Sequence, residues 1–150
     1  MLGRMRGWRY GWAVGVVLVA GGCAETRMGE SGPALYERLG GKPAIQAVVE
    51  AFVANVAQDR RINGRFANVD IPKLKGNLVD QVCQATGGPC QYRGRDMKTT
   101  HAGMRISTSD FDALVEDLRK AMDQLKVPAK EQQELLNLLS PMRPDIVEVP

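Results

Sequence analysis

His101 is the only histidine in this chain of 150 residues, and it limits the chemistry that the sequence can support. A single imidazole excludes the non-haem metal sites that need two or three histidines. No recognisable nucleophile motif accompanies it, so a serine–histidine–acid triad is not predicted. One imidazole is enough to hold a haem iron, provided that an apolar slot between helices accepts the macrocycle. On composition alone a surface or packing role is the simpler interpretation, and only context can favour the ligand role.

Two cysteines form the second candidate constellation. Cys83 and Cys90 flank the segment Thr86-Gly87-Gly88-Pro89, whose residue types allow the backbone to turn back on itself. A disulfide between them is therefore a candidate, and two free thiols are the alternative. Because no histidine cluster accompanies the cysteines, a structural zinc site is not expected.

The third cysteine, Cys23, follows a segment with the pattern of an export signal. Three arginines within the first nine residues precede an apolar run over residues 11–22, with small residues directly before the cysteine. This resembles a bacterial lipoprotein signal, in which the cysteine is lipidated. An uncleaved membrane anchor is the alternative, although about a dozen apolar residues are short for a span. We expect a signal or anchor over residues 1–22, a tether over 23–33 and one domain over 34–150.

These features predict a location in the bacterial cell envelope, with the domain tethered to the membrane and facing the periplasm or the cell exterior. The formal net charge of +3 belongs to the leader, because basic and acidic side chains balance at 17 each once its three arginines are set aside. No basic stretch remains, so nucleic acid is not expected as a partner.

Apolar residues recur at helical spacing through most of the domain. A short helical stretch over residues 34–39 stops at Gly40-Gly41, and a core helix opens at Pro43. Its apolar face carries Ile45, Val48, Val49, Phe52, Val53 and Val56. An irregular stretch over residues 59–70 precedes another helix at Pro72, with Leu74, Leu78 and Val82 on one face.

The second half of the domain is also helical. A short helical turn over residues 97–101 carries His101, and Ser107 and Asp110 form a capping pair that opens a long helix through Lys126. A last helix opens at Pro128. Alternating strand patterns and hairpin dipeptides are missing, so the fold class is all-α.

The order of these segments resembles group 1 truncated haemoglobins over residues 34–149. The resemblance rests on Leu35-Tyr36-Glu37-Arg38-Leu39-Gly40-Gly41, the helix through Val49 and Phe52, Phe66, Lys73-Leu74-Lys75, Gly87-Gly88-Pro89 and Met97-Lys98-Thr99-Thr100-His101-Ala102-Gly103. It implies a truncated globin fold, a two-over-two helical sandwich around haem b.

The resemblance also implies roles for individual residues. His101 becomes the proximal iron ligand, Phe66 stacks against the porphyrin, and Tyr92 and Lys98 pair with the propionates. The remaining expected contacts to the cofactor are Phe52, Val53, Leu74, Leu78, Val82, Met97, Ile106, Phe111 and Leu114. A plain core role explains these apolar residues equally well.

The sequence departs from the family on the distal side of the expected pocket. Many group 1 members place a tyrosine and a glutamine where this chain has Val53 and Leu78, so the usual donors to bound oxygen are missing. Asn77 and Gln81 are the nearest replacements, and we expect both to point outward.

Three classes of function follow. The first is a haem protein that reversibly binds oxygen, nitric oxide or carbon monoxide for carriage or sensing, with no catalytic side chains. The second is a haem enzyme, a nitric oxide dioxygenase or a peroxidase, supplied with electrons by an external reductase. The third is a haem-free helical lipoprotein that serves as an interaction module.

Overall fold

A computed structural model of the chain describes residues 32–150, and these residues are helical, as the sequence predicts. The proposed lipidation residue Cys23 lies outside the described residues. The elements in chain order are α1 (Leu35–Arg38), α2 (Gly41–Gln58), η1 (Asn63–Phe66), α3 (Ile71–Ala85), α4 (Met97–His101), α5 (Thr108–Gln124), α6 (Ala129–Leu139), η2 (Ser140–Met142) and α7 (Arg143–Ile146). No helix among the described residues is long and apolar enough to cross a membrane.

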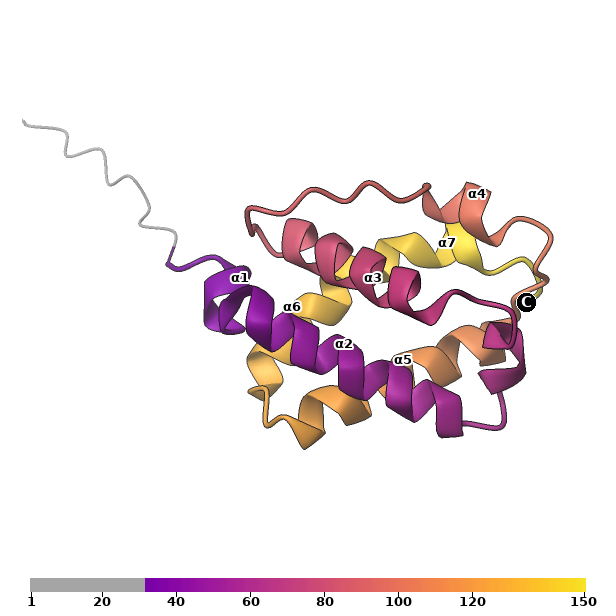
Figure 1. The fold of residues 1–150 in the computed structure, drawn as a ribbon, viewed down its shortest axis with the longest axis horizontal. Helices are drawn as coiled ribbons and strands as arrows, with labels where there is room; N and C mark the ends of the chain where they lie inside the picture. The colour runs from indigo at the N-terminus through magenta and orange to yellow at the C-terminus, as the bar shows by residue number, and fades with distance from the viewer. Residues whose placement is uncertain (1–31) are drawn as a thin grey trace, which may run out of the picture. The chain divides into compact units, whose positions relative to one another are not determined.

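Helix α2 is the central element, and it packs against both α3 and α5 (Figure 1). Its predicted apolar face is buried, with Ile45, Val49 and Val56 each at most 4% exposed. The predicted start at Pro43 is two residues late, because Gly40 takes a left-handed conformation and acts as the N-cap. Pro43 still falls in the first helical turn, where a missing N–H costs no helical hydrogen bond.

A disulfide joins the end of α3 to the loop that leads to α4. Cys83 is fully buried, and its sulfur bonds to that of Cys90. Gly88 lies between them, and a Cβ on it would come within 2.7 Å of the Cys83 sulfur and 2.4 Å of the Tyr36 ring, so only glycine fits there. Closing so short a loop stabilises a fold by about 2 to 3 kcal/mol in the chain-entropy model.

Side-chain caps define where two of the helices begin. Asp70 is the N-cap of α3 and accepts a hydrogen bond from the Lys73 amide. The helix therefore begins at Ile71, one residue before the predicted start at Pro72. The predicted capping pair at α5 is a complete capping box, because Ser107 and Asp110 each accept a hydrogen bond from the other's backbone amide. Helix α5 ends near its predicted limit, where Lys126 takes a positive φ of 55°.

The last part of the chain differs from the single helix expected after Pro128. Helix α6 stops at Leu139, and η2 and α7 follow, each with a proline in its first turn. Arg143 fixes α7 onto α5, because its guanidinium lies 4.9 Å from the centroid of the Phe111 ring and pairs with Asp112 at 2.7 Å. The expected irregular stretch over residues 59–70 likewise contains the short helix η1.

Asp117 of α5 is a buried carboxylate at the interface with α2. It is 5% exposed, and its Oδ2 atom has no hydrogen-bond partner. Burial, and after it the nearby Asp59 carboxylate, raise the pKa of Asp117 above its ordinary value. The folded protein therefore binds the Asp117 proton more tightly than the unfolded chain does. This group contributes stability at low pH, and that contribution is lost as the pH rises through its folded pKa.

Asp117→Asn is expected to raise the free energy of unfolding at pH 7 by about 1 kcal/mol, because a neutral amide removes the cost of the buried charge. The gain should shrink as the pH is lowered through the raised pKa of Asp117, because the wild-type carboxyl then takes up its proton. Urea unfolding at pH 7 and at a pH below that pKa measures it. Glu116→Gln, the same change at the exposed neighbouring position, is the control. An equal gain at both pH values would contradict this account of Asp117.

Candidate functional site

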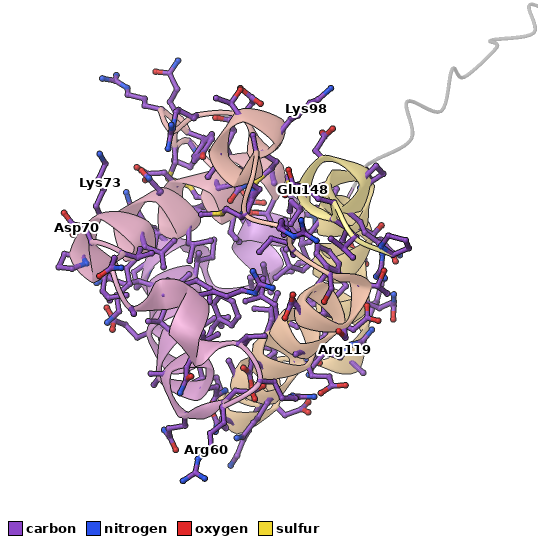
Figure 2. The ribbon with its side chains drawn as sticks, turned by 90° about the vertical axis from the view of Figure 1, so that its right-hand side faces the viewer. Arg60, Asp70, Lys73, Lys98, Arg119 and Glu148 are labelled. Carbon is purple, nitrogen blue, oxygen red and sulfur yellow. A yellow bond between two sulfur atoms is a disulfide. The ribbon has the colours of Figure 1, made fainter. Side chains whose placement is uncertain are left out.

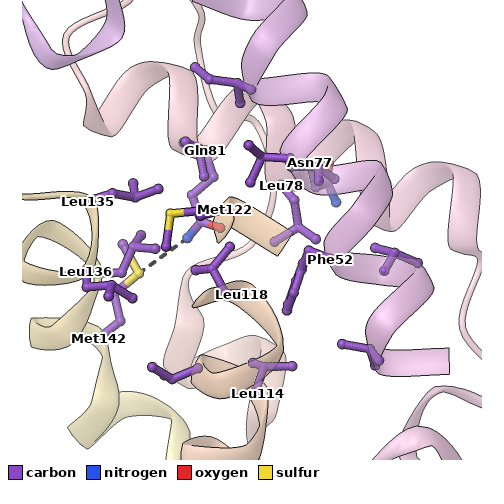
Figure 3. A pocket seen from close by; sticks show the side chains of 18 of the residues that line it. Phe52, Asn77, Leu78, Gln81, Leu114, Leu118, Met122, Leu135, Leu136 and Met142 are labelled. Atoms are coloured by element: carbon purple, nitrogen blue, oxygen red, sulfur yellow. Dashed lines mark hydrogen bonds between the residues drawn. The ribbon is translucent and has the colours of Figure 1, made fainter. Parts of the chain in front are cut away.

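A single large cavity of about 1140 Å³ runs between the helices that carry most of the predicted site residues. Its walls come mainly from α2, α3, α4, α5, α6 and the loop before α4, with further residues from η1, η2 and α7. The labelled side chains around it in Figure 3 are mostly apolar, with Phe52 and Leu78 from α2 and α3 facing Leu114 and Leu118 from α5. Pockets for drug-sized ligands are usually about 300 to 1,000 Å³. This cavity therefore has room for a large and mainly apolar cofactor.

His101 presents a defined face of its imidazole to this cavity. It is the last residue of α4, and its Nδ1 atom lies 2.8 Å from the carbonyl oxygen of Met97. A carbonyl only accepts hydrogen bonds, so Nδ1 carries the proton and Nε2 keeps its lone pair. His101 lines the cavity and is only half buried. A neutral imidazole with one nitrogen fixed by a backbone carbonyl is a typical metal-ligand arrangement.

The start of α4 is held by a carboxylate cap. Asp96 accepts a hydrogen bond from the Thr99 amide at 2.8 Å. That hydrogen bond holds the pKa of the Asp96 carboxyl below its usual range. A helix of five residues has little stability of its own, so caps and neighbours must fix the direction of His101.

The cavity brings together all but two of the predicted cofactor contacts. Lining it are Phe52, Val53, Phe66, Leu74, Leu78, Val82, Tyr92, Met97, His101, Phe111 and Leu114. Ile106 is outside the lining, and its carbonyl accepts hydrogen bonds from the amides of Glu148 and Val149. Lys98 is also outside it, exposed and projecting from the outer side of α4 in Figure 2.

Tyr92 lines the cavity, but its hydroxyl already has a partner in the same loop. It donates to the carbonyl oxygen of Arg95 at 2.8 Å. Burial raises the pKa of Tyr92, and the Asp96 carboxylate adds to the effect, so the phenol stays protonated at neutral pH. Arg93 and Arg95 of this loop line the cavity as well. Both are exposed, so two cations stand where the lining of the cavity reaches solvent.

The expectation that Asn77 and Gln81 point outward is wrong, because both line the cavity. The Gln81 amide nitrogen lies 3.4 Å from the sulfur of Met142 (Figure 3). The sulfur of Met97 lies 3.6 Å from the same nitrogen. Thioether sulfur is a weak acceptor, so the amide keeps most of its capacity to donate. Val53 and Leu78, which replace the family's usual donors, also line the cavity.

Among the lining residues that sequence reasoning did not assign to the site are Gln81, Met122 and Met142. Gln81 follows Leu78 by three positions, so helical spacing alone places it on the same face, and only its polarity argued for solvent. Met122 of α5 lies at helical spacing from Leu118 and is fully buried, yet it also lines the cavity. Met142 lies in η2, a segment too short for any periodicity to reveal.

Comparison with known proteins agrees with this arrangement. The family described as bacterial-like globin matches residues 34–148. The group 1 truncated hemoglobin GlbN of Mycolicibacterium paratuberculosis is 34% identical over 112 residues, which cover 75% of this chain and 82% of that protein. The GlbN protein of a Nostoc species is 36% identical, with 73% of this chain and 92% of that protein covered.

Solved structures agree in fold as well. The Fe(III) form of truncated hemoglobin from Tetrahymena pyriformis superposes with a TM-score of 0.74 at 30% identity, covering 77% of this chain and 98% of that one. The 2/2 hemoglobin of a Synechococcus species, solved with covalently attached heme, gives 0.72 at 30% identity, with the same shares covered. The chain therefore belongs to the bacterial-like globin family, among the group 1 truncated haemoglobins.

Proposed function

We propose that the protein binds haem b in the large cavity, with Nε2 of His101 as the proximal iron ligand, and that it binds a diatomic gas reversibly. The observation that carries this proposal is the hydrogen bond between Nδ1 of His101 and the Met97 carbonyl, which leaves Nε2 free at the wall of an apolar cavity. Ferrous haem supplies the gas-binding chemistry, and the protein supplies the axial ligand and a dry pocket.

Other residues around the cavity exclude water and bind the charged edge of the haem. Phe66, Leu74 and Leu78 exclude water from one part of the cavity, and Phe111 and Leu114 do so on the side of α5. We assign the propionate side to the loop that carries Tyr92, Arg93 and Arg95, since these residues line the cavity and Lys98 does not. Oxygen is our preferred ligand, with nitric oxide and carbon monoxide as alternatives.

A catalytic cycle, such as nitric oxide dioxygenation or peroxide reduction, would need electrons from an external reductase. The largely apolar lining around Val53 and Leu78 disfavours peroxide reduction, because that reaction consumes protons and the lining offers few groups that could move them.

We also propose that the protein is exported and tethered to the membrane through Cys23. The disulfide between Cys83 and Cys90 supports export, because structural disulfides persist in oxidising compartments such as the bacterial periplasm.

Replacing His101 is expected to remove the iron ligand. The His101→Gly protein, expressed with adequate haem, should lose the Soret band of the wild type, and added imidazole should restore it by filling the space of the missing ring. Absorption spectra of the ferric and ferrous forms measure this. Lys98→Ala, a change in the same helix outside the cavity, should keep the wild-type spectrum. A wild type without a Soret band would overturn the proposed function itself.

Leu78→Gln is expected to slow oxygen dissociation by roughly one to two orders of magnitude. The new amide can donate a hydrogen bond to the partly negative bound oxygen, and such a bond contributes about 1.5 to 3 kcal/mol. Carbon monoxide dissociation should change far less. Stopped-flow displacement measures both rates, and Leu78→Met, which adds no donor, is the control. Equal slowing by both variants would show that a donor at position 78 is not the cause.

The proposed processing predicts a mature chain that begins at Cys23 and carries the mass of attached acyl groups. Mass spectrometry of the amino-terminal peptide from bacterial membranes measures it, and Cys23→Ser should remove the lipid mass. An amino-terminal peptide that still contains Arg4 would contradict lipoprotein processing.

A further inference from the structure

The turn that follows His101 is held from two sides by charged side chains of distant segments. Residues 102–105 leave α4 with two positive φ values, 79° at Gly103 and 52° at Arg105. The Met104 amide of this turn bonds back to α4, donating to the His101 carbonyl at 3.0 Å. Two further amides of the turn and two of its carbonyls bond to side chains from distant parts of the chain.

Glu148, close to the carboxyl end of the chain, supplies acceptors for two of these amides. Its Oε1 atom accepts a hydrogen bond from the Gly103 amide at 2.7 Å, and its Oε2 atom accepts one from the Arg105 amide. These two bonds, with the Gly103 amide as the larger cause, hold the pKa of the Glu148 carboxyl below its usual range. In Figure 2 Glu148 lies where α7 and the end of α4 meet.

Arg65 of η1 binds the carbonyls of the same turn. Its guanidinium donates to the Met104 oxygen at 2.9 Å and to the Arg105 oxygen at 3.3 Å. It also pairs with Asp110, the residue that caps α5. A cation on the carbonyls and an anion on the amides thus hold the backbone of Gly103, Met104 and Arg105.

The backbone of the carboxyl-terminal segment reinforces the contact of Glu148. The amides of Glu148 and Val149 donate to the Ile106 carbonyl at 2.9 and 3.1 Å, and the Thr108 amide donates to the Val149 carbonyl at 3.0 Å. Helix α7 also packs against α4. Glu148 is therefore placed by its own backbone and needs no long, flexible reach to meet the turn.

We propose that Glu148 is a positioning residue for His101, with Arg65 as its counterpart on the opposite groups of the turn. The inference rests on the proposed function, because it concerns the hold of His101 on haem iron. Glu148 is exposed, and exposed ionic contacts contribute little to global stability. Its effect falls instead on the direction of a five-residue helix, where a small displacement of Nε2 weakens the bond to iron.

Glu148→Gln tests this inference in the haem-loaded protein. It loses the charge that accepts both amides, so we expect haem transfer to an apomyoglobin acceptor to become roughly three- to ten-fold faster. The iron–histidine stretching band of the ferrous form should shift or broaden in resonance Raman spectra. Glu148→Asp, which keeps the charge on a shorter side chain, should give an intermediate rate. Arg65→Met should disturb the same band from the carbonyl side.

Glu116→Gln is the matched control, since it neutralises an exposed glutamate that pairs with Arg61 away from the cavity. Its haem transfer rate and stretching band should equal those of the wild type. If Glu148→Gln and Arg65→Met behave like this control, the inference is overturned while the proposed function stands. If the wild type itself shows no iron–histidine band, the proposed function fails and the inference with it.

Discussion

The structure depends on one geometric requirement, that the only imidazole of the chain lies at the cavity wall with Nδ1 held by the backbone and Nε2 left to bind iron. The hydrogen bond of Nδ1 to the Met97 carbonyl meets it within a single helical turn. Yet α4 has five residues, too few to be stable alone, so its direction is set from outside. Asp96 caps its start, and contacts to the turn after His101 hold its end. The rest of the fold supplies those contacts and the apolar cavity that His101 lines.

The apolar lining of the cavity determines how well the site can distinguish one gas ligand from another. A bound gas that carries negative charge on its outer atom is stabilised by hydrogen-bond donors, and Val53 and Leu78 provide none. Gln81 keeps an amide inside the cavity, but its nearest acceptors are the sulfurs of Met97 and Met142. The Gln81 amide lies near those two sulfurs, one helical turn beyond Leu78. It adds a polar group to the cavity wall but does not replace the missing donor at position 78. The pocket is therefore suited to haem, but it offers few hydrogen-bond donors that would favour one bound gas over another.

Much of this arrangement follows from local patterns in the sequence. Helices α2 and α5 have buried faces at regular spacing, and the Ser107–Asp110 pair marks the start of α5. The site around His101 came from family resemblance, since one histidine carries no spacing information. What escaped prediction is decided by tertiary contacts: α7 has four residues and no period, Gln81 is polar yet faces inward, and Glu148 lies 45 positions from its partner Gly103. Contacts between distant residues leave no local signal in a single sequence.

The disulfide joins two walls of the cavity covalently, the one formed by α3 and the one formed by the loop before α4. Cys83 belongs to α3, which carries Leu74, Leu78 and Val82, whereas Cys90 begins the loop that leads through Tyr92 to α4. That loop has no helical hydrogen bonds of its own, and its order comes from the Tyr92 amide bonded to Gln84 at 2.6 Å and the Tyr92 hydroxyl bonded to the Arg95 carbonyl. Gly94 permits this packing, because a Cβ there would lie 2.2 Å from the Tyr92 hydroxyl. From Cys90, which is bonded to α3, the loop runs to Asp96, which caps α4. The disulfide therefore restricts how far α4, with His101, can move away from α3. The covalent bond thus fixes a separation that side-chain packing alone would otherwise have to hold.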